Sequence, residues 1–131
     1  MTITINDKIN LYKIQEEFSS LFPFLKLEFY KKVIQRGIVV PRQPIQNMDA
    51  TLSECRTVFN KETVVISPDM TVTELEKNFH DIYGLSTQVF RKSGNVWLVA
   101  TVTDNWTLEE QNRQGEMITK QVNERKLNIN L

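Results

Sequence analysis

The stretch Val64–Lys92, with the sequence VVISPDMTVTELEKNFHDIYGLSTQVFRK, repeats an apolar pattern that the chain already contains 61 positions earlier, in Ile3–Lys31. In each copy, alternating apolar residues predict a short strand, a stripe at helical spacing predicts an amphipathic helix, and a second alternation predicts another strand. Identities are few, and the clear ones are Ile5 with Ile66, Phe18 with Phe79 and Phe29 with Phe90. The sequence therefore predicts a βαβ unit that is used twice.

The ends of the predicted helices carry residues that favour helix starts and stops. Pro23 and Gly84 occupy equivalent places after the two repeat helices, where each favours termination. Capping boxes begin at Thr51, Thr71 and Thr107; in each, a threonine and the glutamate three positions later satisfy each other's free backbone amides. These boxes predict where helices begin and carry no chemistry.

The predicted fold class is α+β: a ferredoxin-like two-layer sandwich from the duplicated βαβ unit, with an extra C-terminal strand and helix. We expect a single domain over residues 1–131. Its expected segments are a first repeat over about 2–32, a connection over 33–62, a second repeat over about 63–93, and the C-terminal strand and helix over 95–126. Pro41 and Pro44 interrupt the connection, which is unusually long for a compact domain.

Composition narrows the functional classes. Sixteen basic residues balance sixteen acidic ones, so no net field attracts the chain to nucleic acid or to anionic lipid. No apolar run approaches the roughly 20 residues that span a bilayer, so we expect no membrane partner. A single cysteine cannot form an internal disulfide, and the N-terminus lacks the pattern of a signal peptide. The expected location is the cytoplasm.

One face of the predicted sheet is the candidate interaction surface. If the alternating residues that include Phe29 and Phe90 face the helices, the opposite face still carries apolar side chains that need cover. Two readings stay open: the C-terminal helix packs on this face, or a protein partner or a second copy of the chain binds there. The candidate interface residues are Tyr30, Val65, Val89, Trp97 and Val99.

Nucleic-acid binding is the alternative function. Basic residues gather at the ends of the two second strands, and aromatic side chains on an exposed sheet can stack on bases. Tyr30 and Trp97 are candidates for stacking, and the candidate basic patch consists of Lys31, Lys32, Arg36, Arg91 and Lys92. The aromatic spacing of an RNA-recognition motif is absent, and basic residues on edge strands also serve to prevent aggregation.

The sequence offers little for catalysis. His80 is the single histidine and has no metal-type ligand at helical spacing, and Cys55 has only Arg56 beside it to favour a thiolate. No phosphate-binding glycine loop, nucleophile elbow or Cys-x-x-Cys motif is present. We expect no catalytic residue, cofactor or metal site, and an enzyme centred on Cys55 or His80 is the third and least favoured class.

The second half of the chain carries a more distinctive pattern. Thr71-Val-Thr-Glu-Leu-Glu-Lys77, Gln88-Val-Phe-Arg-Lys-Ser-Gly94, Trp97-Leu98 and Trp106-Thr-Leu-Glu-Glu-Gln-Asn112 resemble a family of small uncharacterised bacterial proteins. The resemblance extends more loosely over the N-terminal strand and helix and leaves out residues 33–49. It implies a free-standing bacterial protein and transfers no catalytic residue. We therefore expect a non-enzymatic module for protein interaction or homo-oligomerisation that uses an apolar sheet face.

Overall fold

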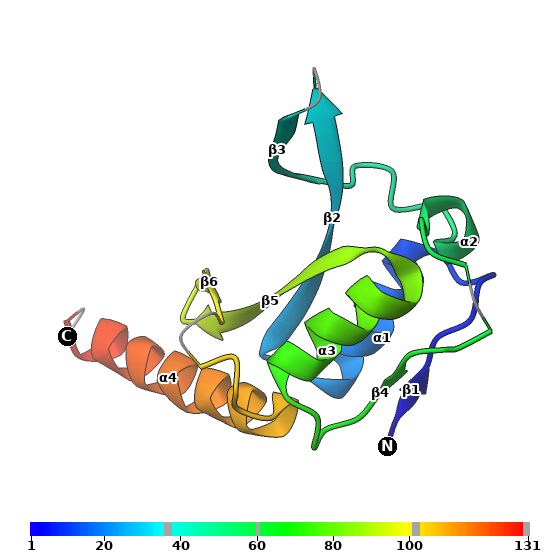
Figure 1. The fold of residues 1–131 in the computed structure, drawn as a ribbon. Helices are drawn as coiled ribbons and strands as arrows, with labels where there is room; N and C mark the ends of the chain where they lie inside the picture. The colour runs from blue at the N-terminus through cyan, green and yellow to red at the C-terminus, as the bar shows by residue number, and fades with distance from the viewer. Residues whose placement is uncertain (36–37, 60, 101–102, 130–131) are drawn as a thin grey trace.

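Two antiparallel sheets and the helices that cover them make up the α+β fold seen in the computed structural model (Figure 1). The structure describes residues 1–35, 38–59, 61–100 and 103–129; the side chains of 32–42, 128 and 129 are not among those described. In chain order the elements are β1 (Ile3–Thr4), α1 (Leu11–Leu21), β2 (Leu25–Gln35), β3 (Ile38–Pro44), α2 (Leu52–Cys55), β4 (Val65–Ile66), α3 (Val72–Asn78), the π-helical turn η1 (Phe79–Tyr83), β5 (Ser86–Ser93), β6 (Val96–Val99) and α4 (Leu108–Ile129).

Strand pairing differs from the predicted ferredoxin-like layer, which is not confirmed. The larger sheet has the order β3-β2-β5-β6, and β1 pairs with β4 in a separate two-stranded ribbon. A ferredoxin-like arrangement would place the first strands of both repeats in the middle of one sheet. Among the described strands, β1 and β4 pair only with each other, and the second strands β2 and β5 form their own ladder. The α+β class is confirmed.

The two repeats are related by an approximate two-fold axis. In the ribbon, Thr4 lies opposite its own counterpart Val65. In the larger sheet, Leu27 lies opposite Val89, and the neighbouring pairs Leu25–Arg91 and Phe29–Thr87 exchange under the same rotation. The predicted duplication therefore has a structural counterpart, in which each repeat forms part of both ladders.

The offset between the repeats changes from 61 to 62 residues within the second repeat. The helix Val72–Tyr83, formed by α3 and η1, is one residue longer than α1 because its last turn is π-helical. Gly84 then ends this helix with φ +70, as predicted. From that point Val89, rather than Gln88, corresponds to Leu27. One inserted residue moves every following side chain of a strand to the other face.

The repeat unit is longer than βαβ. The α2 amide of Leu52 donates to the Ile9 carbonyl at 2.8 Å, and the α4 amide of Leu108 donates to the Met70 carbonyl at the same distance. Because Ile9 and Met70 are 61 positions apart, α2 and α4 begin at equivalent places. The region 33–62, predicted as a connection with one helical turn, also contains β3, and it completes the first βαββα unit. The strand and helix predicted as C-terminal additions, β6 and α4, complete the second βαββα unit.

The threonine half of each predicted capping box is present at the three helix starts, and the Glu54 and Glu110 carboxylates accept from the threonine hydroxyls. The Thr51, Thr71 and Thr107 hydroxyls each accept a hydrogen bond from the backbone amide of the glutamate three residues later, at 3.1–3.3 Å. Local sequence therefore determines these starts independently of strand pairing.

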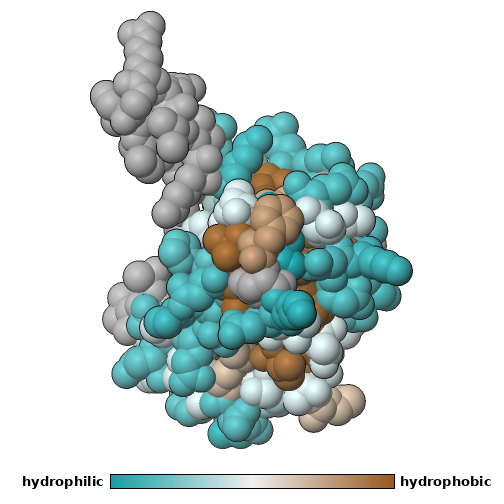
Figure 2. Space-filling model, turned by 45° about the vertical axis from the view of Figure 1, so that its right-hand side comes forward, coloured by the Kyte–Doolittle hydropathy of each residue, from teal (hydrophilic) through white to brown (hydrophobic). Residues whose placement is uncertain are grey.

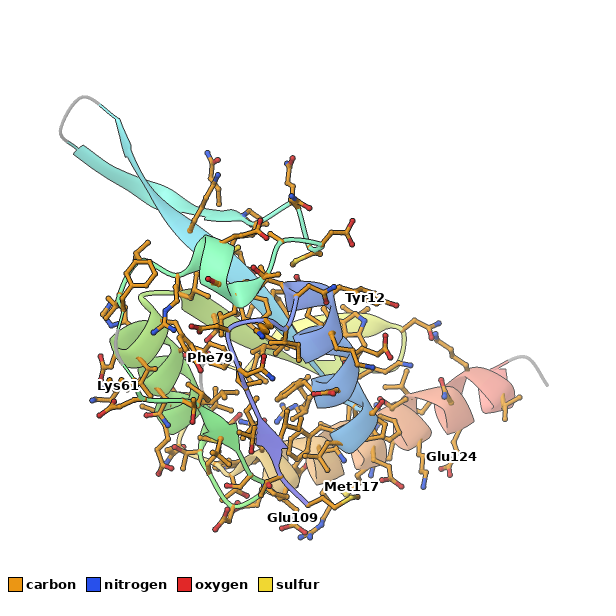
Figure 3. The ribbon with its side chains drawn as sticks, turned by 90° about the vertical axis from the view of Figure 1, so that its right-hand side faces the viewer. Tyr12, Lys61, Phe79, Glu109, Met117 and Glu124 are labelled. Atoms are coloured by element: carbon orange, nitrogen blue, oxygen red, sulfur yellow. The ribbon has the colours of Figure 1, made fainter. Side chains whose placement is uncertain are left out.

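All the longer helices lie on one side of the larger sheet. Phe79 is fully buried, whereas Tyr12 lies on the outer side of α1 (Figure 3). The α1 side chains of Gln15 and Ser19 donate to the Leu27 and Leu25 carbonyls, so α1 also covers a free edge of β2. The β2–β3 hairpin extends away from this body (Figure 1).

Helix α4 packs on the same side as α1 and α3. A Cβ atom at Gly115 would lie 3.1 Å from Arg91 Cγ, and Arg91 donates to Gln111 at 3.0 Å. Arg91 lies opposite the buried Leu25, on the helix-covered face. The reading in which the C-terminal helix covers the other face is therefore wrong, and none of the described helices lies on that face.

Because α2 and α4 begin at equivalent places, we expect the loss of the first leucine side chain of either helix to destabilise the fold to a similar extent. Leu52→Ala and Leu108→Ala should each lower the free energy of unfolding by about 2–5 kcal/mol, because both side chains are fully buried. Urea unfolding followed by circular dichroism measures this. Ser53→Ala, at an exposed position of α2, is the control and should change stability by less than about 0.5 kcal/mol. A Leu52→Ala effect as small as that of the control would contradict the equivalence.

Candidate interaction surface

The face of the larger sheet that carries no helix is the candidate site. Residues directly opposite each other in an antiparallel ladder share a face, so the partners of Lys26, Glu28 and Tyr30 lie beside them. We call this surface the open face, and its members are Lys26, Glu28, Tyr30, Ser86, Gln88, Phe90, Lys92, Trp97 and Val99. It runs across β2, β5 and β6.

Aromatic rings and ammonium groups meet in the middle of the open face. The Nζ atom of Lys26 lies 5.2 Å from the ring centre of Phe90 and 5.3 Å from that of Trp97. Lys92 lies 6.0 Å from the same Trp97 ring. Lys26 is also 3.8 Å from the Glu28 carboxylate. The rings are therefore partly covered by neighbouring charges, an arrangement that contributes about 0.5–1 kcal/mol per contact at exposed sites.

Strand β6 forms one end of the open face and is apolar along its whole length. Val96, Leu98 and Val99 are 57%, 49% and 49% exposed, and Trp97 is partly buried. Within the described residues, β6 pairs only with β5, so its other edge is free. The strand contains none of the lysines or prolines that usually protect a free edge. The opposite end strand, β3, contains Pro41, Arg42 and Pro44.

The predicted interface residues do not all belong to this surface. Tyr30, Trp97 and Val99 lie on the open face. Val89 is fully buried against the helices, so its place in the predicted interface is wrong. Val65 is exposed but belongs to the separate β1–β4 ribbon.

The π-helical turn explains the error at Val89. At a constant offset of 61, Phe90 corresponds to the buried Phe29; the extra residue in η1 instead turns Phe90 to the open face. Sequence reasoning therefore missed Phe90 as a surface residue. Either Val89 or Phe90 can fill a core position, so the residue types in β5 did not indicate which of the two faces the helices.

The predicted basic patch is not one surface. Lys31 and Lys92 lie at opposite ends of the β2–β5 ladder, roughly 20 Å apart along the strands. Arg91 faces α4, where it hydrogen-bonds Gln111 and lies 5.9 Å from the Trp106 ring. The side chain of Lys32 and the whole of Arg36 lie outside the described residues.

A buried arginine has a structural role that the sequence did not reveal. The Arg56 side chain is 2% exposed, forms an ion pair with Asp7, and donates to the carbonyls of Val58 and Ile82. It also lies over the Tyr83 ring, 4.8 Å from its centre. Arg56 therefore ties the end of α2 to the first loop and to η1.

The two residues considered for catalysis lie in ordinary surroundings. Burial, together with the nearby Glu54 carboxylate, raises the pKa of the Cys55 thiol, which disfavours the reactive thiolate. His80 is exposed and contacts Asp81, whose pKa is lowered by hydrogen bonds from Lys77 and His80. In the described part of the chain, no three His, Cys, Asp or Glu side chains are grouped as a metal site would require.

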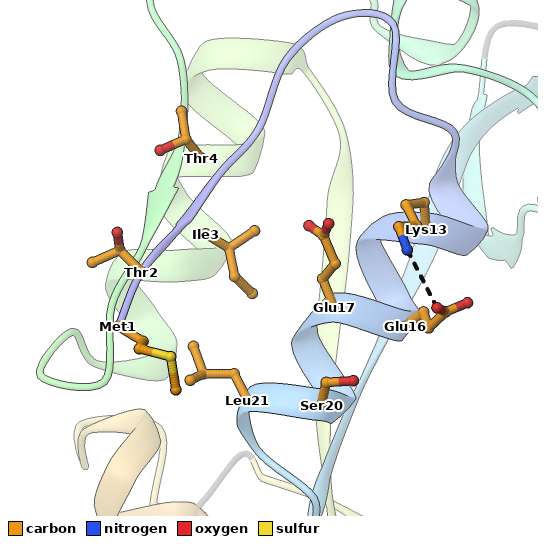
Figure 4. Close-up of a pocket in the computed structure, with 9 residues that line it drawn as sticks. All are labelled: Met1, Thr2, Ile3, Thr4, Lys13, Glu16, Glu17, Ser20 and Leu21. Atoms are coloured by element: carbon orange, nitrogen blue, oxygen red, sulfur yellow. Dashed lines mark hydrogen bonds and ion pairs between the residues drawn. The ribbon is translucent and has the colours of Figure 1, made fainter.

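A shallow groove lies between β1 and α1 (Figure 4). It has a volume of about 460 Å³ and is lined by Met1, Thr2, Ile3, Thr4, Lys13, Glu16, Glu17, Ser20 and Leu21. Lys13 and Glu16 on its rim pair at 3.3 Å. The one buried side-chain atom without a partner among the described residues, Thr87 Oγ1, is not in this lining. Among the described residues, the groove therefore contains no buried side-chain polar atom that lacks a hydrogen-bond partner.

On the face in Figure 2, apolar side chains form small separate areas within a hydrophilic surface. None of the described helices combines the length and apolarity needed to cross a bilayer. The chain matches no protein family, no curated protein and no solved structure. The resemblance to a family of small bacterial proteins therefore stays a prediction.

The raised pKa of Cys55 predicts slow alkylation. At pH 8, iodoacetamide should modify the native protein more slowly than the same protein in denaturant, because less of the partly buried Cys55 thiol is ionised at that pH. Mass spectrometry of timed samples gives both rates, and the denatured sample is the control. A faster reaction in the native state would instead indicate an activated thiol and favour the enzyme class.

Proposed function

We propose that the protein acts by binding another protein through β6 and the adjoining open face. The observation that carries this proposal is the exposed, uncharged edge strand Val96–Val99. A free apolar edge adds readily to another strand, and natural proteins usually protect such edges. The partly covered rings of Phe90 and Trp97 beside it supply aromatic area of the kind that anchors protein interfaces.

Nucleic-acid binding is the second candidate, and one observation favours it. Lys26 and Lys92 lie beside the rings of Phe90 and Trp97, and single-stranded nucleic acid is bound by such combinations of stacking and positive charge. The distribution of charge argues against it. Lys26 is paired with Glu28, Arg91 faces α4, and Lys31 lies at the far end of the ladder. We therefore place protein binding first.

Site-specific photocrosslinking tests the proposal. The chain with Trp97→p-benzoylphenylalanine, produced and irradiated in the cytoplasm of its host, should form a covalent adduct with a protein. Tyr12→p-benzoylphenylalanine is the matched control, because Tyr12 is 56% exposed and lies on α1, away from β6. Its adduct yield should be at least about tenfold lower, as expected for a specific buried contact. Denaturing electrophoresis with mass spectrometry identifies the adduct.

Two results would contradict protein binding. An adduct at position 97 that nuclease removes would transfer the proposal to nucleic acid. Equal yields at positions 97 and 12 would mean that neither position lies in a specific interface.

A further inference from the structure

We infer that the strand that pairs with β6 is β6 of a second copy of this chain, in a two-fold antiparallel arrangement with Leu98 opposite the Leu98 of the other copy. This inference rests on the proposed function and names its partner. The two larger sheets then join into one continuous sheet across the β6 edges.

The backbone of β6 determines which groups are available for pairing. Ala100, directly after β6, donates its N–H to the Val89 carbonyl at 3.1 Å. Hydrogen-bonded and non-hydrogen-bonded pairs alternate along an antiparallel ladder. The backbone groups of Leu98 therefore also point toward β5, and those of Trp97 and Val99 point away from it. Trp97 and Val99 thus offer two N–H and two carbonyl groups at the free edge.

Two-fold symmetry restricts the register. A two-fold axis perpendicular to the sheet keeps each side chain on its own face. Because side chains alternate between the faces, an odd-numbered residue can lie opposite only an odd-numbered residue of the other copy, and an even-numbered residue only an even-numbered one. Centring the axis on Leu98 places Trp97 opposite Val99 of the other copy, and all four backbone groups form hydrogen bonds. Centring it on Trp97 would instead place Val99 opposite Asn95, which belongs to the β5–β6 turn. The Leu98 register is therefore the better one.

The side chains match in the same register. Trp97 lies against Val99 of the other copy on the open face, an aromatic and β-branched pair of the kind that stabilises sheets. On the helix side, Leu98 lies against Leu98. No charged side chain is present in Val96–Val99, so the pairing leaves no charge buried without a partner.

In a dimer, the composition of the two edge strands favours the pairing of β6 with β6 over the pairing of β6 with β3 of the other copy. Edge β3 contains two prolines, Pro41 and Pro44, which cannot donate to a ladder. Four residues bury much less area than the roughly 1,600 Å² of a standard interface. We therefore expect a dissociation constant on the order of micromolar.

Cysteine crosslinking tests the register. In a Cys55→Ser background, Leu98→Cys should form a disulfide-linked dimer under mild oxidation, because non-hydrogen-bonded antiparallel partners have Cα atoms about 4.5 Å apart. Val96→Cys is the matched control. In the Leu98 register, Val96 lies opposite Ala100 of the other copy, and the two Val96 residues are four residues apart along the strand, roughly 13 Å. Val96→Cys should therefore not crosslink. Non-reducing electrophoresis at low micromolar concentration distinguishes them. Equal crosslinking of the two variants, or none at Leu98→Cys, would overturn the register.

Sedimentation velocity tests the dimer itself. Between about 5 and about 500 µM, the native chain should change from monomer to dimer. Val99→Pro should stay monomeric at concentrations at least about tenfold higher, because it removes the N–H that Val99 would donate to Trp97 of the other copy and leaves the ladder with β5 intact. Val99→Thr, which keeps this N–H and a β-branched side chain, is the matched control and should dimerise like the native chain. A native chain that stays monomeric over this range would overturn the inference.

The photocrosslinking experiment separates the two proposals. A monomeric chain that still forms a protein adduct at position 97 would overturn the second copy as partner and support the proposed function. A monomeric chain without such an adduct would overturn both.

Discussion

Leu27 and Val89 lie opposite each other at the centre of the β2–β5 ladder, and both are buried beneath α1 and α3. This pair lies on the approximate two-fold axis, so the antiparallel pairing of β2 with β5 sets the position of every other element. With β2 and β5 paired, the first strands β1 and β4 form a separate ribbon, and α1 covers the free edge of β2. Hydrophobic burial at this centre is the dominant favourable term, because it removes apolar side chains of both repeats from water.

The two repeats differ where the candidate site arises. The last helix of the first repeat, α2, has 4 residues, whereas α4 has 22 and packs beneath the end of β5. Gly115 lets α4 approach Phe24 and Arg91 closely. Since α4 uses the helix side of the sheet, the open face and the outer edge of β6 are left without cover. The exposed apolar strand is thus a consequence of where the longest helix packs.

The part of the fold that could be predicted from sequence is the part that short-range patterns specify. Apolar spacing and the boxes at Thr51, Thr71 and Thr107 located the helices, and the duplication was visible as a shift of 61 residues. The interface prediction failed at Val89, because a single extra residue in η1 exchanged the two sets of β5 side chains between the helix-covered face and the open face. A π-helical turn has no strong sequence signature, and either phase leaves an apolar residue in the core.

By itself, the sequence determined the α+β class, the repeated order of strand and helix, and the helix ends at Thr51, Thr71, Gly84 and Thr107, because local hydrogen bonds and side-chain periodicity act over a few residues. Only the tertiary structure decided which strands pair, which side of the sheet α4 covers, and that Phe90 and Trp97 share the open face with Lys26. These features depend on contacts between residues tens of positions apart. Several pairings of the same strands bury similar apolar area, so the choice among them is made by the packing of the whole chain.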